Sequence, residues 1–178
     1  PYNSALAFAA DGELVGCYRK RHLFDVELPD GARYEESRGT TPGDELVVVE
    51  LAGLRCGLSI CYDLRFPEHY RALVAAGAEL LLVPAAFTRT TGTDHFLVLL
   101  RARAIENQCW VVAANQWGSH PGGRETFGHS CVIDPWGRVV VDAGDGVGVV
   151  SASVDLDQLQ EVRQCLPALA HRRDQVRG

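Results

Sequence analysis

The sequence lacks any apolar run of the roughly 18 residues that a membrane-spanning helix needs, and we expect no signal peptide in its first residues. It also lacks a positive net charge, because 23 acidic residues outnumber 17 basic ones and leave a formal charge of −6. This balance argues against nucleic acid or an anionic membrane surface as the main partner. No two cysteines form a C-x-x-C pair, so neither a zinc site nor a thiol redox motif is indicated.

Cysteine itself is present, at six positions, and Cys56, Cys109 and Cys131 fall in apolar segments where the thiol behaves as a small hydrophobe. This usage is typical of a reduced, intracellular protein, and we expect a cytoplasmic location. With 178 residues, 47% of them hydrophobic, the chain is long enough for one domain with a hydrophobic core.

Hydrophobic periodicity predicts strands that alternate with helices, which is typical of an α/β fold. The expected strands and hairpins are a hairpin around Asp11-Gly12, strands over 45–50 and 54–61, strands over 79–87 and 109–116, a hairpin over 128–144 and a strand over 147–156. The expected helices span 66–78, 93–108 and 155–167, and residues 21–44 are expected to form a loop. Strand, helix and strand between 54 and 87 form a βαβ unit, so its strands should be parallel.

Cys61 ends a strand that is apolar on nearly every residue, just before the helix expected over 66–78. Ligands bind at this edge of α/β sheets. A helix start offers the positive end of the helix dipole and free backbone N–H groups, which lower the pKa of a thiol. We interpret Cys61 as a candidate nucleophile and the backbone N–H of Tyr62 as a candidate oxyanion donor. A core cysteine that closes a strand is the alternative interpretation.

A cysteine nucleophile also needs a base and a group that stabilises charge. None of the six histidines stands out by its position. Lys20, however, is the single lysine among the 17 basic residues. Because positive charge elsewhere in this chain is supplied by arginine, we interpret the compact ammonium of Lys20 as a candidate catalytic group. The alternative is an ordinary solvated lysine.

Five blocks of sequence occur in an order that resembles the nitrilase, or carbon–nitrogen hydrolase, superfamily, and within it the Nit-like amidase branch. The resemblance extends from Tyr2 to Arg173. The blocks are YRKRHLFD (18–25), ICYDLRFPE (60–68), LLRARAIENQCWVVAANQWG (99–118), GHSCVIDPWG (128–137) and VDLDQLQEVRQCLPALAHRR (154–173).

The resemblance implies a four-layer αββα sandwich, which we expect to be incomplete in this chain. It also implies a Glu-Lys-Cys triad, in which Lys20 matches the lysine and Cys61 the nucleophile. Glu36 matches a second glutamate that holds the lysine in this family. Glu35 is the neighbouring alternative, and spacing alone does not separate the two.

The general-base glutamate of the family lies upstream of the lysine, and Asp11 and Glu13 do not match it. We therefore expect residues 1–178, which begin at Pro1, to be the carboxyl-terminal portion of a carbon–nitrogen hydrolase domain. By itself this portion is expected to lack the base.

The resemblance implies hydrolysis of a small carboxylated amide to a carboxylate and ammonia through a cysteine thioester, without a metal or an organic cofactor. Arg65 is a candidate anchor for the substrate carboxylate, with a bracing ion pair to Asp63 or Glu68 as its alternative role. Phe87 and His95 are further candidates for substrate binding, with core packing as the alternative for Phe87.

Several alternatives stay open at this stage. The residues do not separate omega-amidase, deaminated glutathione amidase, N-carbamoyl amide hydrolase and nitrilase activities. A truncated, non-catalytic relative that acts as a binding or assembly module is the alternative from a different class. The family also implies association into a homodimer.

Overall fold

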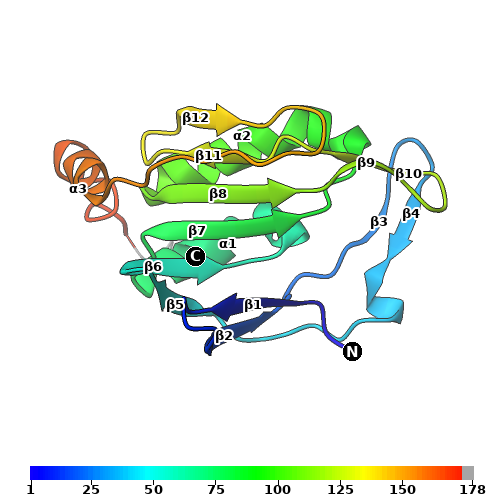
Figure 1. Cartoon of the computed structure of the whole chain (residues 1–178), viewed down its shortest axis with the longest axis horizontal. Coiled ribbons are helices and arrows are strands. Elements are labelled where there is room, and N and C mark those ends of the chain that lie inside the picture. The colour runs from blue at the N-terminus through cyan, green and yellow to red at the C-terminus, as the bar shows by residue number, and fades with distance from the viewer. Residues whose placement is uncertain (174–178) are drawn as a thin grey trace.

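A six-stranded mixed sheet forms the centre of the protein in the computed structural model, which describes residues 1–173 (Figure 1). Its strands lie in the order β12-β11-β8-β7-β6-β5. Their bounds are β5 (Val48–Leu51), β6 (Leu54–Leu58), β7 (Leu80–Ala85), β8 (Trp110–Asn115), β11 (Cys131–Ile133) and β12 (Val139–Asp142). β6, β7 and β8 are parallel, and the outer neighbours pair antiparallel.

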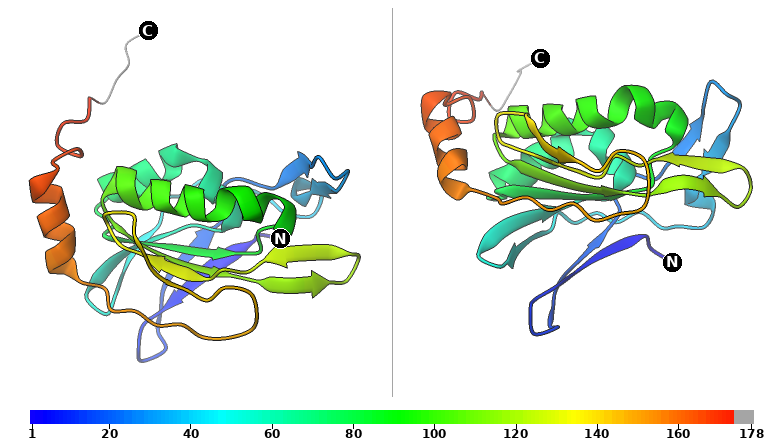
Figure 2. Two further views of the ribbon diagram at one scale, coloured as in Figure 1. Left: turned by 90° about the horizontal axis from the view of Figure 1, so that it is seen from above. Right: turned by 45° about the horizontal axis from the view of Figure 1, so that its top comes forward.

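Two helices provide the crossovers between the parallel strands and cover the same face of the sheet (Figure 2). α1 (Pro67–Ala75) joins β6 to β7 and begins at a proline, whose fixed φ suits the first helical position. α2 (Arg89–Asn107) joins β7 to β8 and is N-capped by Thr88, whose side chain accepts a hydrogen bond from the backbone N–H of Thr91.

Three hairpins and a short helix surround the sheet. The hairpin of β1 (Ser4–Phe8) and β2 (Leu14–Arg19) lies on the face opposite α1 and α2 (Figure 2). Two more hairpins lie beyond the carboxyl ends of β7 and β8, and α3 lies at the opposite end of the sheet (Figure 1). They are formed by β3 (Asp25–Glu27) with β4 (Arg33–Glu35) and β9 (Trp117–His120) with β10 (Arg124–Phe127), and α3 spans Leu156–Cys165.

The hydrophobic core lies between the sheet and the two covering helices. Leu81 and Val83 of β7 and Val111 of β8 are fully buried, as are Phe96 and Leu100 of α2. The central parallel strands are therefore apolar along their buried length, as the sequence predicts. Within residues 1–173, no helix combines the length and the apolar composition needed to cross a membrane.

The predicted α/β class is confirmed, together with the βαβ unit and the hairpins around Asp11-Gly12 and Pro135-Trp136-Gly137. The helical layer, the central sheet and the β1–β2 hairpin correspond to part of the predicted sandwich. The helix predicted to begin at residue 93 begins earlier, at Arg89, because Thr88 supplies the cap. Residues 174–178 of the predicted domain lie outside the described residues.

Two predictions of secondary structure are wrong. Residues 21–44 are not a continuous loop, since they contain the β3–β4 hairpin and a 3-10 helix, Glu36–Arg38. Strands of three residues are too short to show a period in the sequence. Residues 147–156 do not form the predicted strand, and Val147 is 98% exposed. Alternating apolar residues make a strand only where a neighbouring strand accepts and donates hydrogen bonds.

Candidate active site

A cavity of about 990 Å³ opens at the carboxyl ends of the parallel strands. Cys61, Lys20 and Glu36 all line it, together with residues of the β3–β4 and β9–β10 hairpins. The cavity therefore lies where ligands bind in α/β sheets, and it brings together residues that are far apart in the sequence. The hairpin residues in its wall were not predicted from the sequence, because short hairpins leave little periodic signal.

The sequence predicted that Cys61 ends a strand, and this prediction is wrong. The strand ends at Leu58, and Cys61 opens a 3-10 helix that spans Cys61–Arg65. Its backbone has a φ of +47°, in the left-handed region that residues with a side chain rarely adopt. A strained backbone of this kind is frequent where a fold presents a nucleophile at a sharp turn after a strand.

The pKa of the Cys61 thiol is raised, not lowered. Burial raises it most, while a hydrogen bond with the Ala86 backbone and the charge of Lys20 lower it, and Glu36 and Asp63 raise it further. The prediction of a thiol made acidic by a helix start is therefore wrong. The physical reason is that burial of the sulfur outweighs the groups that lower its pKa, and α1 begins only at Pro67, beyond the short 3-10 helix. A sulfur in this environment needs a general base to form the thiolate.

Lys20 is not a solvated lysine, because its side chain is only 3% exposed. Its ammonium Nζ lies 2.5 Å from Oε2 of Glu36. The same carboxylate accepts hydrogen bonds from the backbone N–H of Phe24 at 2.7 Å and from Nδ2 of Asn3 at 3.0 Å. Burial raises the pKa of Glu36, but these hydrogen bonds and the charge of Lys20 outweigh it and leave the pKa lowered. Glu36 is thus a carboxylate at neutral pH, and the ammonium of Lys20 has a fixed counter-charge.

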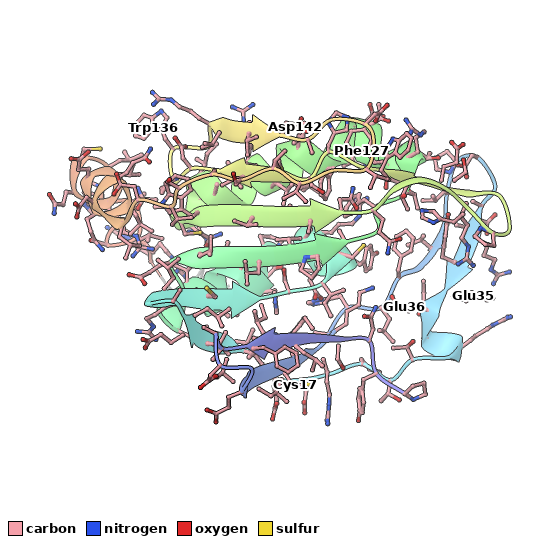
Figure 3. The ribbon with its side chains drawn as sticks, in the orientation of Figure 1. Cys17, Glu35, Glu36, Phe127, Trp136 and Asp142 are labelled. Carbon is pink, nitrogen blue, oxygen red and sulfur yellow. The ribbon has the colours of Figure 1, made fainter. Side chains whose placement is uncertain are left out.

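The neighbouring acid Glu35 has different partners. Its carboxylate pairs with Arg33 at 3.1 Å and with Arg38 at 2.9 Å. Figure 3 shows Glu36 nearer to the central sheet than Glu35. The acid in contact with Lys20 is therefore Glu36, a distinction that spacing alone could not make.

Arg65, Phe87 and His95 come together at one side of the cavity. The Arg65 guanidinium carbon lies 5.1 Å from the centre of the Phe87 ring, and its Nη1 lies 3.2 Å from Nδ1 of His95. Arg65 and Phe87 line the cavity, whereas His95 is exposed on α2 and contacts Arg65 from outside the lining. Among the described residues, neither Asp63 nor Glu68 pairs with Arg65, so the bracing role considered for Arg65 is not observed.

Asp63 braces the turn that carries Cys61. Its buried carboxylate accepts a hydrogen bond from the backbone N–H of Ile60 at 2.8 Å. Its further contacts with Tyr18 and His22 were not foreseen, since they join residues more than forty positions apart.

Three features bear on what chemistry the described residues could support. Over residues 1–173, no carboxylate is hydrogen-bonded to the sulfur of Cys61. Within the same range, no group of three or more His, Cys, Asp and Glu side chains is arranged to hold a metal ion. All six cysteines are free thiols.

The profile of the family described as "Carbon-nitrogen hydrolase" matches residues 1–164. The chain belongs to this family. It is 49% identical over 173 residues to a deaminated glutathione amidase of Synechocystis, an alignment that covers 96% of this chain and 64% of the relative. It is 48% identical to the deaminated glutathione amidase of Bos taurus, covering 99% of this chain and 54% of the relative.

Among solved structures of the family, the C. elegans NitFhit protein superposes with a TM-score of 0.91 at 46% identity, covering 97% of this chain and 42% of that protein. The carbon–nitrogen hydrolase chain described here thus spans between 54% and 64% of the length of the two curated relatives. The predicted family and its Nit-like branch are confirmed.

Proposed function

We propose that the full-length protein hydrolyses the carbon–nitrogen bond of a small carboxylated amide through a thioester on Cys61. The observation that carries the proposal is the buried Lys20–Glu36 pair, which lines the same cavity as Cys61. A structural ion pair would not need to face a cavity that also contains an unpaired cysteine. The two amidase relatives support the same reaction class.

In the first half of the reaction, a base removes the proton from Cys61 and the sulfur attacks the carbonyl carbon of the amide. The ammonium of Lys20 and the backbone N–H of Tyr62 stabilise the oxyanion, and one such donor contributes about 3 kcal/mol. The proton held by the base passes to the amide nitrogen, the C–N bond breaks and ammonia leaves. The acyl group is then a thioester on Cys61.

In the second half, the base takes a proton from water and the hydroxide attacks the thioester carbon. The C–S bond breaks, the sulfur recovers a proton, and the product leaves as a carboxylate. Glu36 is not free to act as this base, because its carboxylate holds Lys20. The family resemblance assigns the base to a glutamate upstream of the lysine, and Asp11 and Glu13 lie instead around the β1–β2 turn.

Arg65 is proposed to bind the carboxylate of the substrate. Its guanidinium lines the cavity, stacks over Phe87 and has no carboxylate partner among residues 1–173. A planar guanidinium can accept a carboxylate in a bidentate geometry, which selects for amides that carry one. His95 is proposed to orient this guanidinium.

The test is a panel of small amides, with and without a carboxylate, scored by ammonia release from the full-length protein. Because both relatives are named deaminated glutathione amidases, deaminated glutathione belongs in the panel. The Cys61→Ala variant should lower turnover at least about a thousandfold while keeping the melting temperature. Residual turnover above a few per cent of wild type would remove Cys61 from the mechanism.

A non-catalytic binding module is the second candidate, favoured by the lack of a carboxylate bonded to the Cys61 sulfur within residues 1–173. It predicts that no amide in the panel releases ammonia, while carboxylated amides still bind. Calorimetry with the same panel separates the two candidates.

We further propose that the protein is a cytoplasmic homodimer. The family resemblance supports the dimer, and six free thiols support a reducing compartment. Light scattering on the full-length protein and fractionation of the source cells test these two points.

A further inference from the structure

The carboxylate of Asp63 is fully buried and accepts four hydrogen bonds. Its Oδ2 accepts from the hydroxyl of Tyr18 at 2.6 Å and from the backbone N–H of Ile60 at 2.8 Å. Its Oδ1 accepts from the backbone N–H of His22 at 3.1 Å and lies 2.7 Å from the ring nitrogen Nδ1 of the same histidine. A buried carboxylate is tolerated only with such a set of donors, so all four contacts hold it in one place.

The donors come from two segments that both carry site residues. Ile60 directly precedes Cys61, while Tyr18 and His22 lie two positions before and after Lys20. One carboxylate therefore ties both sides of Lys20 to the turn that carries Cys61. We call these four residues, Tyr18, His22, Ile60 and Asp63, the Asp63 network.

Rigid packing surrounds the two side-chain donors. Tyr18 is fully buried, and its hydroxyl also accepts a hydrogen bond from the backbone N–H of Arg21 at 3.2 Å. The His22 ring stacks on Phe66, with 3.8 Å between the ring centres and 9° between their planes. Burial and then the charge of Asp63 raise the pKa of Tyr18, so its hydroxyl stays a neutral donor.

Asp134 is a second aspartate whose carboxylate accepts hydrogen bonds from the backbone of its own turn. It is also buried, and it accepts from the backbone N–H groups of Trp136 at 2.9 Å and Arg138 at 2.8 Å. Both of these donors belong to the turn between β11 and β12, and the one further contact of this carboxylate within residues 1–173 is a hydrogen bond from Nε2 of Gln158 on α3 at 3.1 Å. For Asp63, by contrast, the Ile60 N–H alone would complete the turn, and three of its four contacts reach the segment around Lys20.

We propose that Asp63 is a positioning residue that, through Tyr18 and His22, fixes the ammonium of Lys20 relative to the sulfur of Cys61. The proposal rests on the proposed function for its effect on turnover. Its effect on the pKa of the Cys61 sulfur can be measured whether or not the protein hydrolyses an amide. A loosened Lys20 should leave substrate binding in place but weaken the stabilisation of the oxyanion, so kcat should fall while KM changes little.

The test uses Tyr18→Phe and His22→Ala in the full-length protein, since each removes one side-chain donor and leaves the Asp63 side chain in place. His22→Asn is the conservative variant, because its amide can donate in place of the ring N–H. Tyr70→Phe is the matched control: Tyr70 is equally buried, and its hydroxyl donates to Ser59 at 2.9 Å without a hydrogen bond to Asp63. Burial raises the pKa of Tyr70, so its hydroxyl is neutral between pH 6 and 10 and its removal changes no charge near Cys61.

The first readout is the rate at which iodoacetamide alkylates the partly buried Cys61 between pH 6 and 10. Mass spectrometry follows this rate, because Cys17 and Cys165 are exposed and will react as well. The charged and titratable groups that act on this sulfur are Lys20, Glu36, Asp63, Arg65 and Tyr70. Lys20 lowers the pKa of Cys61. Loosening Lys20 should therefore move the alkylation profile of Y18F and H22A to higher pH by about 0.5 unit or more.

The second readout is turnover. We expect kcat to fall about tenfold or more in Y18F and H22A, with KM within about threefold of wild type, and to recover in H22N. In an Asp63→Asn background, adding Y18F should lower kcat by less than about twofold, because the connection is already broken.

The two readouts distinguish a failure of the proposed function from a failure of the proposed role of Asp63. If wild type releases no ammonia but Y18F and H22A still shift the alkylation profile, the proposed function fails and the Asp63 network stands. If Y18F and H22A lose stability like Y70F but keep the wild-type alkylation profile, Asp63 only braces the fold and the proposal is overturned.

Discussion

The ammonium of Lys20 and the carboxylate of Glu36 form a short ion pair, 2.5 Å between Nζ and Oε2, in the wall of the cavity that contains Cys61. The two residues come from different local structures, since Lys20 follows strand β2 and Glu36 opens a 3-10 helix after β4. Only the folded chain brings them together. Substitutions in this pair should therefore affect both the stability of the fold and the proposed reaction.

Lys20→Arg is expected to abolish turnover almost completely, although the positive charge is kept. The planar guanidinium is larger than an ammonium and does not fit a site that is 3% exposed. We expect kcat to fall at least about a hundredfold, measured by ammonia release. Arg19→Lys, at the neighbouring exposed position, is the control and should keep wild-type kcat. A K20R variant with wild-type kcat would remove Lys20 from the mechanism.

Glu36→Gln should make stability less dependent on pH. The folded pKa of Glu36 is lowered, so the carboxylate stabilises the fold above its unfolded pKa, and this contribution is lost as pH falls through the folded value. Urea unfolding at pH 7 should show a loss of about 3 kcal/mol in E36Q, because the buried ammonium of Lys20 loses its counter-charge. The difference from wild type should shrink below about pH 4 to 5. A difference that stays constant down to pH 3 would show that the charge of Glu36 contributes nothing to stability.

Arg65→Ala should raise KM for carboxylated amides about tenfold or more, because the proposed bidentate contact is lost. An amide of the same size without a carboxylate serves as the internal control, and its KM should change less than about threefold. Steady-state kinetics on both substrates measure the effect. If R65A raises KM equally for both amides, Arg65 shapes the cavity without binding the carboxylate.

Gly92→Ala should destabilise the protein, even though alanine favours a helix. Gly92 lies in α2, and an added Cβ would lie 2.3 Å from Cβ of Phe127 on β10. Relief of that overlap should cost about 1–3 kcal/mol, which exceeds the gain of about 1 kcal/mol in helix propensity. Gly148→Ala, with no atom within 4 Å of its Cβ position, is the control. If thermal melts give G92A and G148A the same melting temperature, the close contact between Gly92 and Phe127 is contradicted.

The sequence identified Lys20 by its rarity and Cys61 by its place after an apolar strand, and both line the cavity. It could not give the direction of the Cys61 pKa shift, because that depends on how deeply the turn is buried and where α1 begins. It also missed Tyr18 and His22 as partners of Asp63, which lie 45 and 41 positions away. Contacts at such separation are set by the packing of β2 against the sheet and leave no local pattern.

The left-handed backbone at Cys61 restricts which amino acids can serve there. Unbranched side chains such as serine tolerate a φ of +47° far better than β-branched ones. The hydroxyl of threonine is a nucleophile in other hydrolases. Threonine is nevertheless disfavoured at this position, because its β-branched side chain fits a positive φ poorly. Evolution or design of a different nucleophile on this turn therefore favours unbranched side chains such as serine or aspartate over threonine, unless the turn itself is rebuilt.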